Sequence, residues 1–208
     1  MIKRILMSAV VLGLVACSLP TRGPVTPTSF MVNPERSGAP LKARTSYWLK
    51  IGSVSVSAPF DGRSLVYRLS DQRFEKDFYN VYTVLPAEMI SNAERQWINQ
   101  SGIFSAAVGQ SNSFFPFYTL QASVNEFYGD YRVRPEAVVS IEFFLTVENA
   151  GKTSPIIGTN RYTKRIALKD NTPGSLALGQ QQALAEIFKE YEVQLDKYAA
   201  NLPKPLGQ

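Results

Sequence analysis

The chain has 208 residues, and its 22 Lys and Arg against 17 Asp and Glu give a formal net charge of +5. Because histidine is absent, catalytic triads that use His, histidine general bases and nearly every conventional zinc site are excluded. No run of Lys and Arg indicates a nucleic-acid surface. We therefore expect no enzyme, with no catalytic residue, no metal and no noncovalent cofactor.

A lipoprotein signal peptide is predicted for residues 1–16. Two basic residues precede the apolar stretch 5–16, which has the length of a signal-peptide core and falls short of the roughly 20 residues of a membrane-spanning helix. The sequence LVAC at 14–17 resembles the lipobox of bacterial lipoproteins. We expect a diacylglycerol joined to the thiol of Cys17 through a thioether, with fatty acids such as palmitate, and cleavage of the chain before this residue. Cys17 is the only cysteine, so a disulfide is excluded.

A flexible tether is predicted for residues 17–46, where Pro, Ser, Thr and Gly recur without an apolar period. Ser18 follows the lipidated cysteine at the position where an Asp commonly retains bacterial lipoproteins in the inner membrane. Its presence favours the outer membrane. We expect a periplasm-facing domain, lipid-anchored to the outer membrane of a Gram-negative bacterium.

The globular domain is predicted over residues 47–202, with a tail at 203–208. Alternating apolar residues predict a first strand from Tyr47, and a change of phase at Gly52 indicates a bulge or a bend. The sequence at 65–68 favours a short second strand. The stretch that follows favours a third strand or an ordered loop. Its expected buried anchors are Phe74, Phe78, Tyr79 and Tyr82.

A helix is predicted to begin near Pro86 and to end before Gly102. Two strands with clear alternation follow at 118–128 and 137–149, and a less apolar strand, nearer a sheet edge, begins at 156. Thr172 caps a final helix. The apolar faces of the two helices are expected at Met89, Ile90, Ala93 and Trp97, and at Leu184, Phe188, Tyr191, Leu195 and Tyr198. The expected fold class is α+β, a mostly antiparallel sheet with two helices packed on one face, in a two-layer sandwich.

Several motifs of this domain occur in a recognisable order. They are YWLKIGSVSV at 47–56, LVYR at 65–68, YTVLP at 82–86, MI at 89–90 and SGIF at 101–104. With the lipobox and the tether, this order resembles the ABC-type transport auxiliary lipoprotein family (PqiC/YmbA-like) over most of residues 44–200. The resemblance implies an outer-membrane accessory component that works with an inner-membrane ABC permease and an MCE-domain protein. Such systems move lipid between the two membranes and support membrane integrity.

Two groups of residues are candidates for contact with a partner or with lipid. The first is the aromatic cluster Phe114, Phe115, Phe117 and Tyr118 around Pro116. The second is Tyr67 with Arg68, on the short second strand. Core packing at a strand entrance is the alternative for the aromatic cluster. The alternative for Arg68 is a surface charge whose apolar stem covers neighbouring side chains.

Two functions remain open at the level of sequence. The chain is either an accessory subunit that docks to partner proteins, or a carrier that holds lipid or a small apolar ligand in its own cavity. A carrier needs an apolar cavity of a few hundred Å³, and a filled core would favour the docking subunit. Assembly into a homo-oligomer also stays open.

Overall fold

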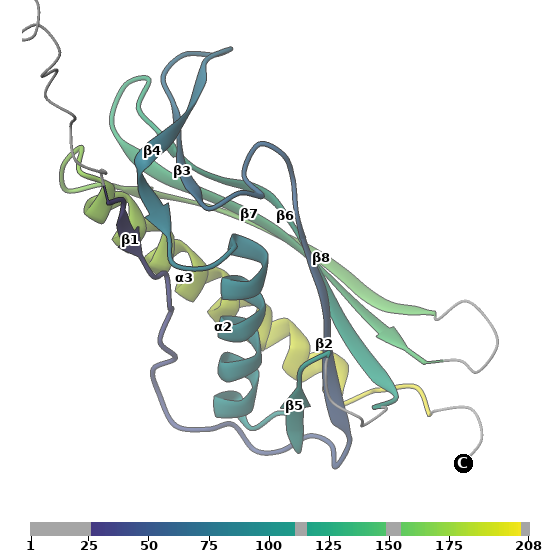
Figure 1. Cartoon of the computed structure of the whole chain (residues 1–208). Coiled ribbons are helices and arrows are strands. Elements are labelled where there is room, and N and C mark those ends of the chain that lie inside the picture. The colour runs from purple at the N-terminus through teal and green to yellow at the C-terminus, as the bar shows by residue number, and fades with distance from the viewer. Residues whose placement is uncertain (1–25, 111–115, 149–154, 205–208) are drawn as a thin grey trace, which may run out of the picture.

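The computed structural model describes residues 26–110, 116–148 and 155–204. Within them, a mixed eight-stranded sheet forms one layer, and two helices pack on one face of it (Figure 1). In chain order the elements are β1 (Thr28–Phe30), β2 (Trp48–Val56), β3 (Ser64–Arg68), β4 (Phe74–Tyr82), α2 (Pro86–Ser101), β5 (Ala106–Val108), β6 (Tyr118–Asp130), β7 (Glu136–Val147), β8 (Ile156–Ala167) and α3 (Pro173–Ala199).

Strand β6 lies at the centre of the sheet because both of its edges are paired. Along one edge it runs antiparallel to β7, from Tyr118 opposite Val147 to Asp130 opposite Glu136. Along the other edge, β2 pairs in parallel with the first half of β6, and β3 pairs in parallel with its last residues. Beyond these, β5 adjoins β2, the pair β4–β1 adjoins β3, and β8 adjoins β7 as the less apolar edge strand that the sequence predicts.

The expected fold class is wrong in one respect, because the sheet is mixed rather than mostly antiparallel. The chain is α+β, but four of the seven strand pairs within the described ranges are parallel. Alternation of apolar residues indicates that one face of a strand is buried, and it carries no information on the direction of the neighbouring strand. Strands β2 and β3 pair with a strand more than 60 positions later in the chain.

Most local predictions are confirmed. The register between β2 and β6 shifts between Ile51 and Val54, which is the bulge expected at Gly52. Helix α2 begins at Pro86 and ends at Gly102, whose φ of 72° is the left-handed conformation that glycine favours. Helix α3 follows Thr172, and the side-chain oxygen of this residue accepts a hydrogen bond from the backbone N–H of Ser175.

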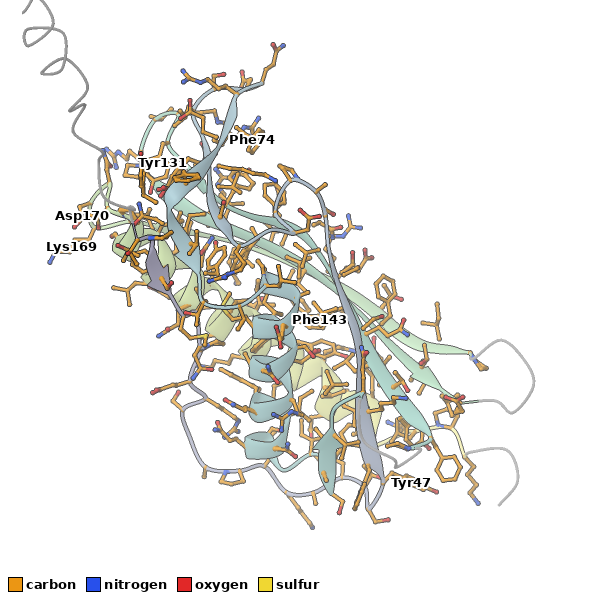
Figure 2. All side chains as sticks on the ribbon, viewed as in Figure 1. Tyr47, Phe74, Tyr131, Phe143, Lys169 and Asp170 are labelled. Carbon is orange, nitrogen blue, oxygen red and sulfur yellow. The ribbon has the colours of Figure 1, made fainter. Side chains whose placement is uncertain are left out.

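The core lies between the sheet and the two helices. Phe143 of β7 stacks on Tyr191 of α3, with ring centroids 4.1 Å apart and planes 9° from parallel. Figure 2 shows Phe143 among the side chains that fill this layer. Leu120 and Ile141 of the sheet are fully buried, which matches the alternation that predicted their strands. The predicted helix faces are buried at Met89, Ile90, Ala93, Trp97, Leu184, Phe188, Tyr191 and Leu195, and Tyr198 is partly buried.

The tether expected over 17–46 is not a separate, flexible segment along the described part of its length. Strand β1 pairs with β4, and the side chain of Val32 is fully buried. The side chain of Arg36 forms an ion pair with Glu192 of α3. Residues 31–46, here called the N-terminal segment, therefore belong to the domain. Isolated contacts of this kind leave no apolar period in a sequence rich in Pro and Ser, so the pattern did not reveal them.

Several predictions concern residues that the structure does not describe. These are the signal peptide of residues 1–16, the lipidation of Cys17 and the last four residues of the tail. Over the described ranges, neither helix combines the length and the apolar character that crossing a bilayer demands.

Candidate functional site

The two groups of candidate contact residues lie at opposite ends of the sheet. Tyr118 is the first residue of β6, whereas Tyr67 of β3 pairs with Gly129, near the end of β6. Eleven strand residues at about 3.3 Å each separate these positions by ~36 Å. The sequence-predicted residues therefore do not form one site. Phe114 and Phe115 lie outside the described residues.

At the end where β6 begins, aromatic side chains serve mainly to close the core. The side chain of Tyr118 is fully buried, and its hydroxyl donates a hydrogen bond of 2.7 Å to the carbonyl oxygen of Pro203. The ring of Phe117 is half-buried and packs edge-on against Tyr47, with centroids 6.2 Å apart. Figure 2 shows Tyr47 at this end of the molecule. Core packing thus accounts for Tyr118, while Phe117 retains partial exposure.

At the other end, Tyr67 supports a neighbouring backbone feature. Its hydroxyl donates a hydrogen bond of 2.7 Å to Oδ2 of Asp77, and burial together with this bond raises the pKa of Tyr67 well above its ordinary value. The Oδ1 atom of Asp77 accepts the backbone N–H groups of Tyr79 at 2.8 Å and of Asn80 at 2.9 Å. Partial burial alone would raise the pKa of Asp77, but these hydrogen bonds lower it overall.

The hydrogen bonds of Asp77 hold a bulge in β4. Lys76 pairs with Val66 and Val81 pairs with Ser64, so residues 77–80 face a single residue of β3. We call residues 77–80 the aromatic bulge, because it carries Phe78 and Tyr79. Their side chains are 75% and 55% exposed, and their rings contact edge-on with centroids 5.3 Å apart.

The aromatic bulge corrects the prediction of four buried anchors in this stretch. Tyr82 is buried, at 1% exposure, but Phe74, Phe78 and Tyr79 are exposed. An aromatic-rich strand sequence is typical of a half-buried surface, and the pattern does not reveal that extra residues on one strand turn two rings outward. The run Asp-Phe-Tyr-Asn at 77–80 was the available signal, since Asp and Asn favour local turns.

Arg68 is bound within its own turn. Its guanidinium carbon lies 5.4 Å from the centroid of the Phe74 ring, and its Nε and Nη2 donate to the backbone carbonyls of Ser70 and Asp71. Figure 2 shows Phe74 on the hairpin formed by β3 and β4. The docking role expected for Arg68 thus competes with these contacts within its own turn.

A network of ion pairs lies beside Arg68. The carboxylate of Asp130 accepts two hydrogen bonds from the guanidinium of Arg132, at 2.8 and 2.9 Å, and one of 2.6 Å from Arg165. The bonds from Arg132 are the main reason that the pKa of Asp130 lies far below its usual range. The network borders an open hollow of about 700 Å³. Three acidic and three basic side chains line it, namely Asp71, Asp130, Glu136, Arg132, Arg134 and Arg165. Their charges balance, so the hollow favours neither an anion nor a cation.

A small cavity lies between α2 and α3. Its volume is about 10 Å³, which is room for one water molecule. The carboxyl group of Glu94 borders it and is 2% exposed, and burial raises its pKa to about 8. Neither oxygen of Glu94 nor the hydroxyl of Tyr191 has a hydrogen-bond partner among the described residues. Among the described residues as a whole, no cluster of acidic or thiol side chains could hold a metal ion.

No protein-family model matches this sequence, and no curated protein matches it significantly. Solved structures do share its fold. XCC0632 from Xanthomonas campestris, a protein of family DUF330, is 17% identical with a TM-score of 0.64, over 83% of this chain and 97% of that one. An uncharacterized protein is 16% identical with a TM-score of 0.60, over 82% and 99%. The hypothetical protein CT253 from Chlamydia trachomatis is 8% identical with a TM-score of 0.50, over 74% and 98%. The α+β fold is therefore one that DUF330 proteins share.

Proposed function

We propose that the chain is a lipid-anchored accessory subunit of an ABC/MCE-type lipid transport system, facing the periplasm from the outer membrane and acting by docking to partner subunits. The observation that carries this proposal is the filled layer between the sheet and the helices. The cavity between α2 and α3 has a volume of about 10 Å³, far below the few hundred Å³ that a bound lipid requires. The hollow of about 700 Å³ is open and lined mainly by charged side chains.

The shared fold supports the same proposal. DUF330 is the PqiC/YmbA-like family, whose motifs this sequence resembles between residues 47 and 104. The lipobox at 14–17 supports the anchor independently of the fold. A diacylglycerol joined to the thiol of Cys17 would leave the domain attached to one membrane, with its surfaces available to proteins of the other membrane.

We place the partner contact at the end of the sheet where β6 begins. This end lies away from β1, the first strand of the described chain (Figure 1). It carries the half-buried ring of Phe117 and the side chain of Ile156, which is 62% exposed. Apolar groups that stay accessible beside a packed core are the usual anchors of a protein–protein contact.

Purification of the lipidated protein from bacterial membranes tests this function. Permease and MCE-domain subunits at stoichiometric levels would support it, and Phe117→Asp should reduce their recovery. Val193→Asp is the matched control, because Val193 is 58% exposed on α3 and lies outside the proposed contact. Phospholipid bound one-to-one by an isolated monomer would instead establish the carrier.

A further inference from the structure

We infer that the aromatic bulge is a membrane-contact surface, at which Phe78 and Tyr79 insert into the boundary between lipid headgroups and acyl chains. The bilayer is the one that holds the lipidated N-terminus, so this inference rests on the proposed anchor at Cys17. It adds a second point of attachment, made by the folded domain itself.

The aromatic bulge presents its two rings in a fixed arrangement. Asp77 accepts hydrogen bonds from the backbone N–H groups of Tyr79 and Asn80 and from the hydroxyl of Tyr67. The side-chain amide of Asn80 donates a further bond of 2.9 Å to Oδ2 of Asp77. The backbone of the bulge is thereby ordered before any contact forms, which lowers the conformational entropy lost on binding. Such a scaffold for two exposed rings is not needed to complete the core.

The rings lie where the chain leaves the domain toward its lipid. Thr28 pairs with Asn80, and β1 runs parallel to β4. The residues that precede Thr28 therefore leave the sheet on the side of Tyr79 and Phe78. Cys17 is eleven positions before Thr28. A chain of this length spans at most ~39 Å when fully extended, and ~18 Å on average as a flexible coil.

The chemistry of the two side chains matches the interface of a bilayer. Phe78 offers an apolar ring, and Tyr79 combines an apolar ring with a hydroxyl that remains in the headgroup region. Lys76, exposed two positions before Phe78, has no ion-pair partner within the described ranges and can attract anionic lipid. Two inserted rings bind weakly alone, but a tether keeps their effective concentration near millimolar, so a weak contact is populated.

The other strongly exposed apolar side chains do not combine these features. Val133 is 92% exposed at the turn between β6 and β7, and Val193 is 58% exposed on α3. Singly exposed apolar residues are normal on protein surfaces. Among the described residues, only the aromatic bulge combines two exposed rings in mutual contact with a position beside β1, the strand at which the described chain begins.

Fluorescence quenching of the lipidated protein in vesicles tests the insertion. The vesicles contain phosphatidylethanolamine and phosphatidylglycerol, with lipids brominated on their acyl chains. Phe78→Trp places a fluorophore in the aromatic bulge, and we expect its emission to be quenched beyond the background that Trp48 and Trp97 give in the unmodified chain. Val193→Trp, on α3, is the matched control and should show no such additional quenching.

The outcomes separate this inference from the proposed anchor. If the chain remains on the vesicles while Trp at position 78 is quenched no more than Trp at position 193, the aromatic bulge does not insert and the inference is overturned. If the chain leaves the vesicles, the anchor itself fails. Sedimentation in detergent tests whether the rings instead contact a second copy of the chain. If the double substitution Phe78→Ser and Tyr79→Ser converts an oligomer to a monomer, the rings belong to a protein interface and the membrane contact is overturned.

Discussion

Arg36 and Glu192, 156 positions apart in the chain, form a partly buried bidentate ion pair. Nε of Arg36 lies 2.8 Å from Oε2 of Glu192, and Nη2 lies 2.9 Å from Oε1. Their side chains are only 6% and 12% exposed. The indole N–H of Trp97 donates a third hydrogen bond, of 2.7 Å, to Oε2. Glu192 of α3 therefore joins the N-terminal segment, α2 and α3 in one arrangement.

Removal of this cation should destabilise the fold. We expect Arg36→Ala to lower the free energy of unfolding by about 2 kcal/mol, because Glu192 then stays largely shielded from water without its counter-charge. Urea denaturation measures the loss. Arg44→Ala is the control, since Arg44 also pairs with α3, through Asp196, but is 45% exposed. Arg44→Ala should lower the free energy of unfolding far less than Arg36→Ala. Equal losses in the two variants would contradict the role given to burial.

The glycine after α2 should resist substitution. Gly102 has a φ of 72°, and a Cβ at this position would lie 3.2 Å from the carbonyl oxygen of Leu41. We expect Gly102→Ala to cost about 1 kcal/mol of unfolding free energy. Gly62→Ala is the matched control, because its Cβ would meet no atom within 4 Å and the residue has no positive φ. Thermal denaturation of both variants distinguishes a strained position from a general effect of the added methyl group.

The buried carboxyl of Glu94 should make stability depend on pH. Burial raises its pKa to about 8, from an ordinary value of 4.5. Between these values the folded chain retains a proton on Glu94 that the unfolded chain has released. The free energy of unfolding contributed by this group therefore falls as pH rises from about 4.5 to about 8.

Glu94→Gln should remove this dependence. Near pH 4.5 we expect the variant to have nearly the stability of the unmodified chain, and near pH 8 to be more stable by an amount on the order of a few kcal/mol. Urea denaturation across this range measures the difference. Glu88→Gln, at an exposed position of the same helix, should leave the slope unchanged. A slope unaltered by Glu94→Gln would show that this carboxyl ionises in the folded state as it does in the unfolded chain.

The order of the aromatic bulge should depend on Asp77. Asp77→Ala removes the acceptor of two backbone N–H groups, so we expect faster hydrogen exchange at Tyr79 and Asn80 and weaker quenching of Trp at position 78 in vesicles. Tyr67→Phe removes one donor to Oδ2 of Asp77 and keeps Oδ1, which accepts the two backbone N–H groups. Its effect on hydrogen exchange should therefore be smaller. Unchanged exchange in Asp77→Ala would show that the backbone of β4 holds its shape without this side chain.

Local features of the fold could be predicted from sequence because they depend on neighbouring residues. Pro86 and Gly102 mark the two ends of α2, and Gly52 marks the bulge of β2 through a change of phase. Strand direction could not be predicted in this way, since β2 and β3 share one edge of a strand that follows more than 60 positions later. Pairing over such distances is decided by packing in three dimensions.

The candidate sites were harder to predict for a related reason. Phe78 and Tyr79 have the residue types of core anchors, and only the paired residues on β3 show that the rings turn outward. Glu94 has the charge of a surface residue on α2, yet lies against α3. In each case the deciding quantity is which element covers the side chain, and the residue type does not carry that information.

The parallel pairing of β2 and β3 with β6 sets an order in which the sheet can form. Leu49 and Tyr118 are paired but 69 positions apart, so β2 cannot pair with β6 until β6 has been synthesised. The β3–β4 hairpin can close earlier from local contacts. Contacts of such separation form slowly, because the intervening chain must first be ordered. The edge of β2 that pairs with β6 therefore stays open until β6 has been made, and an unpaired strand edge favours association with other chains.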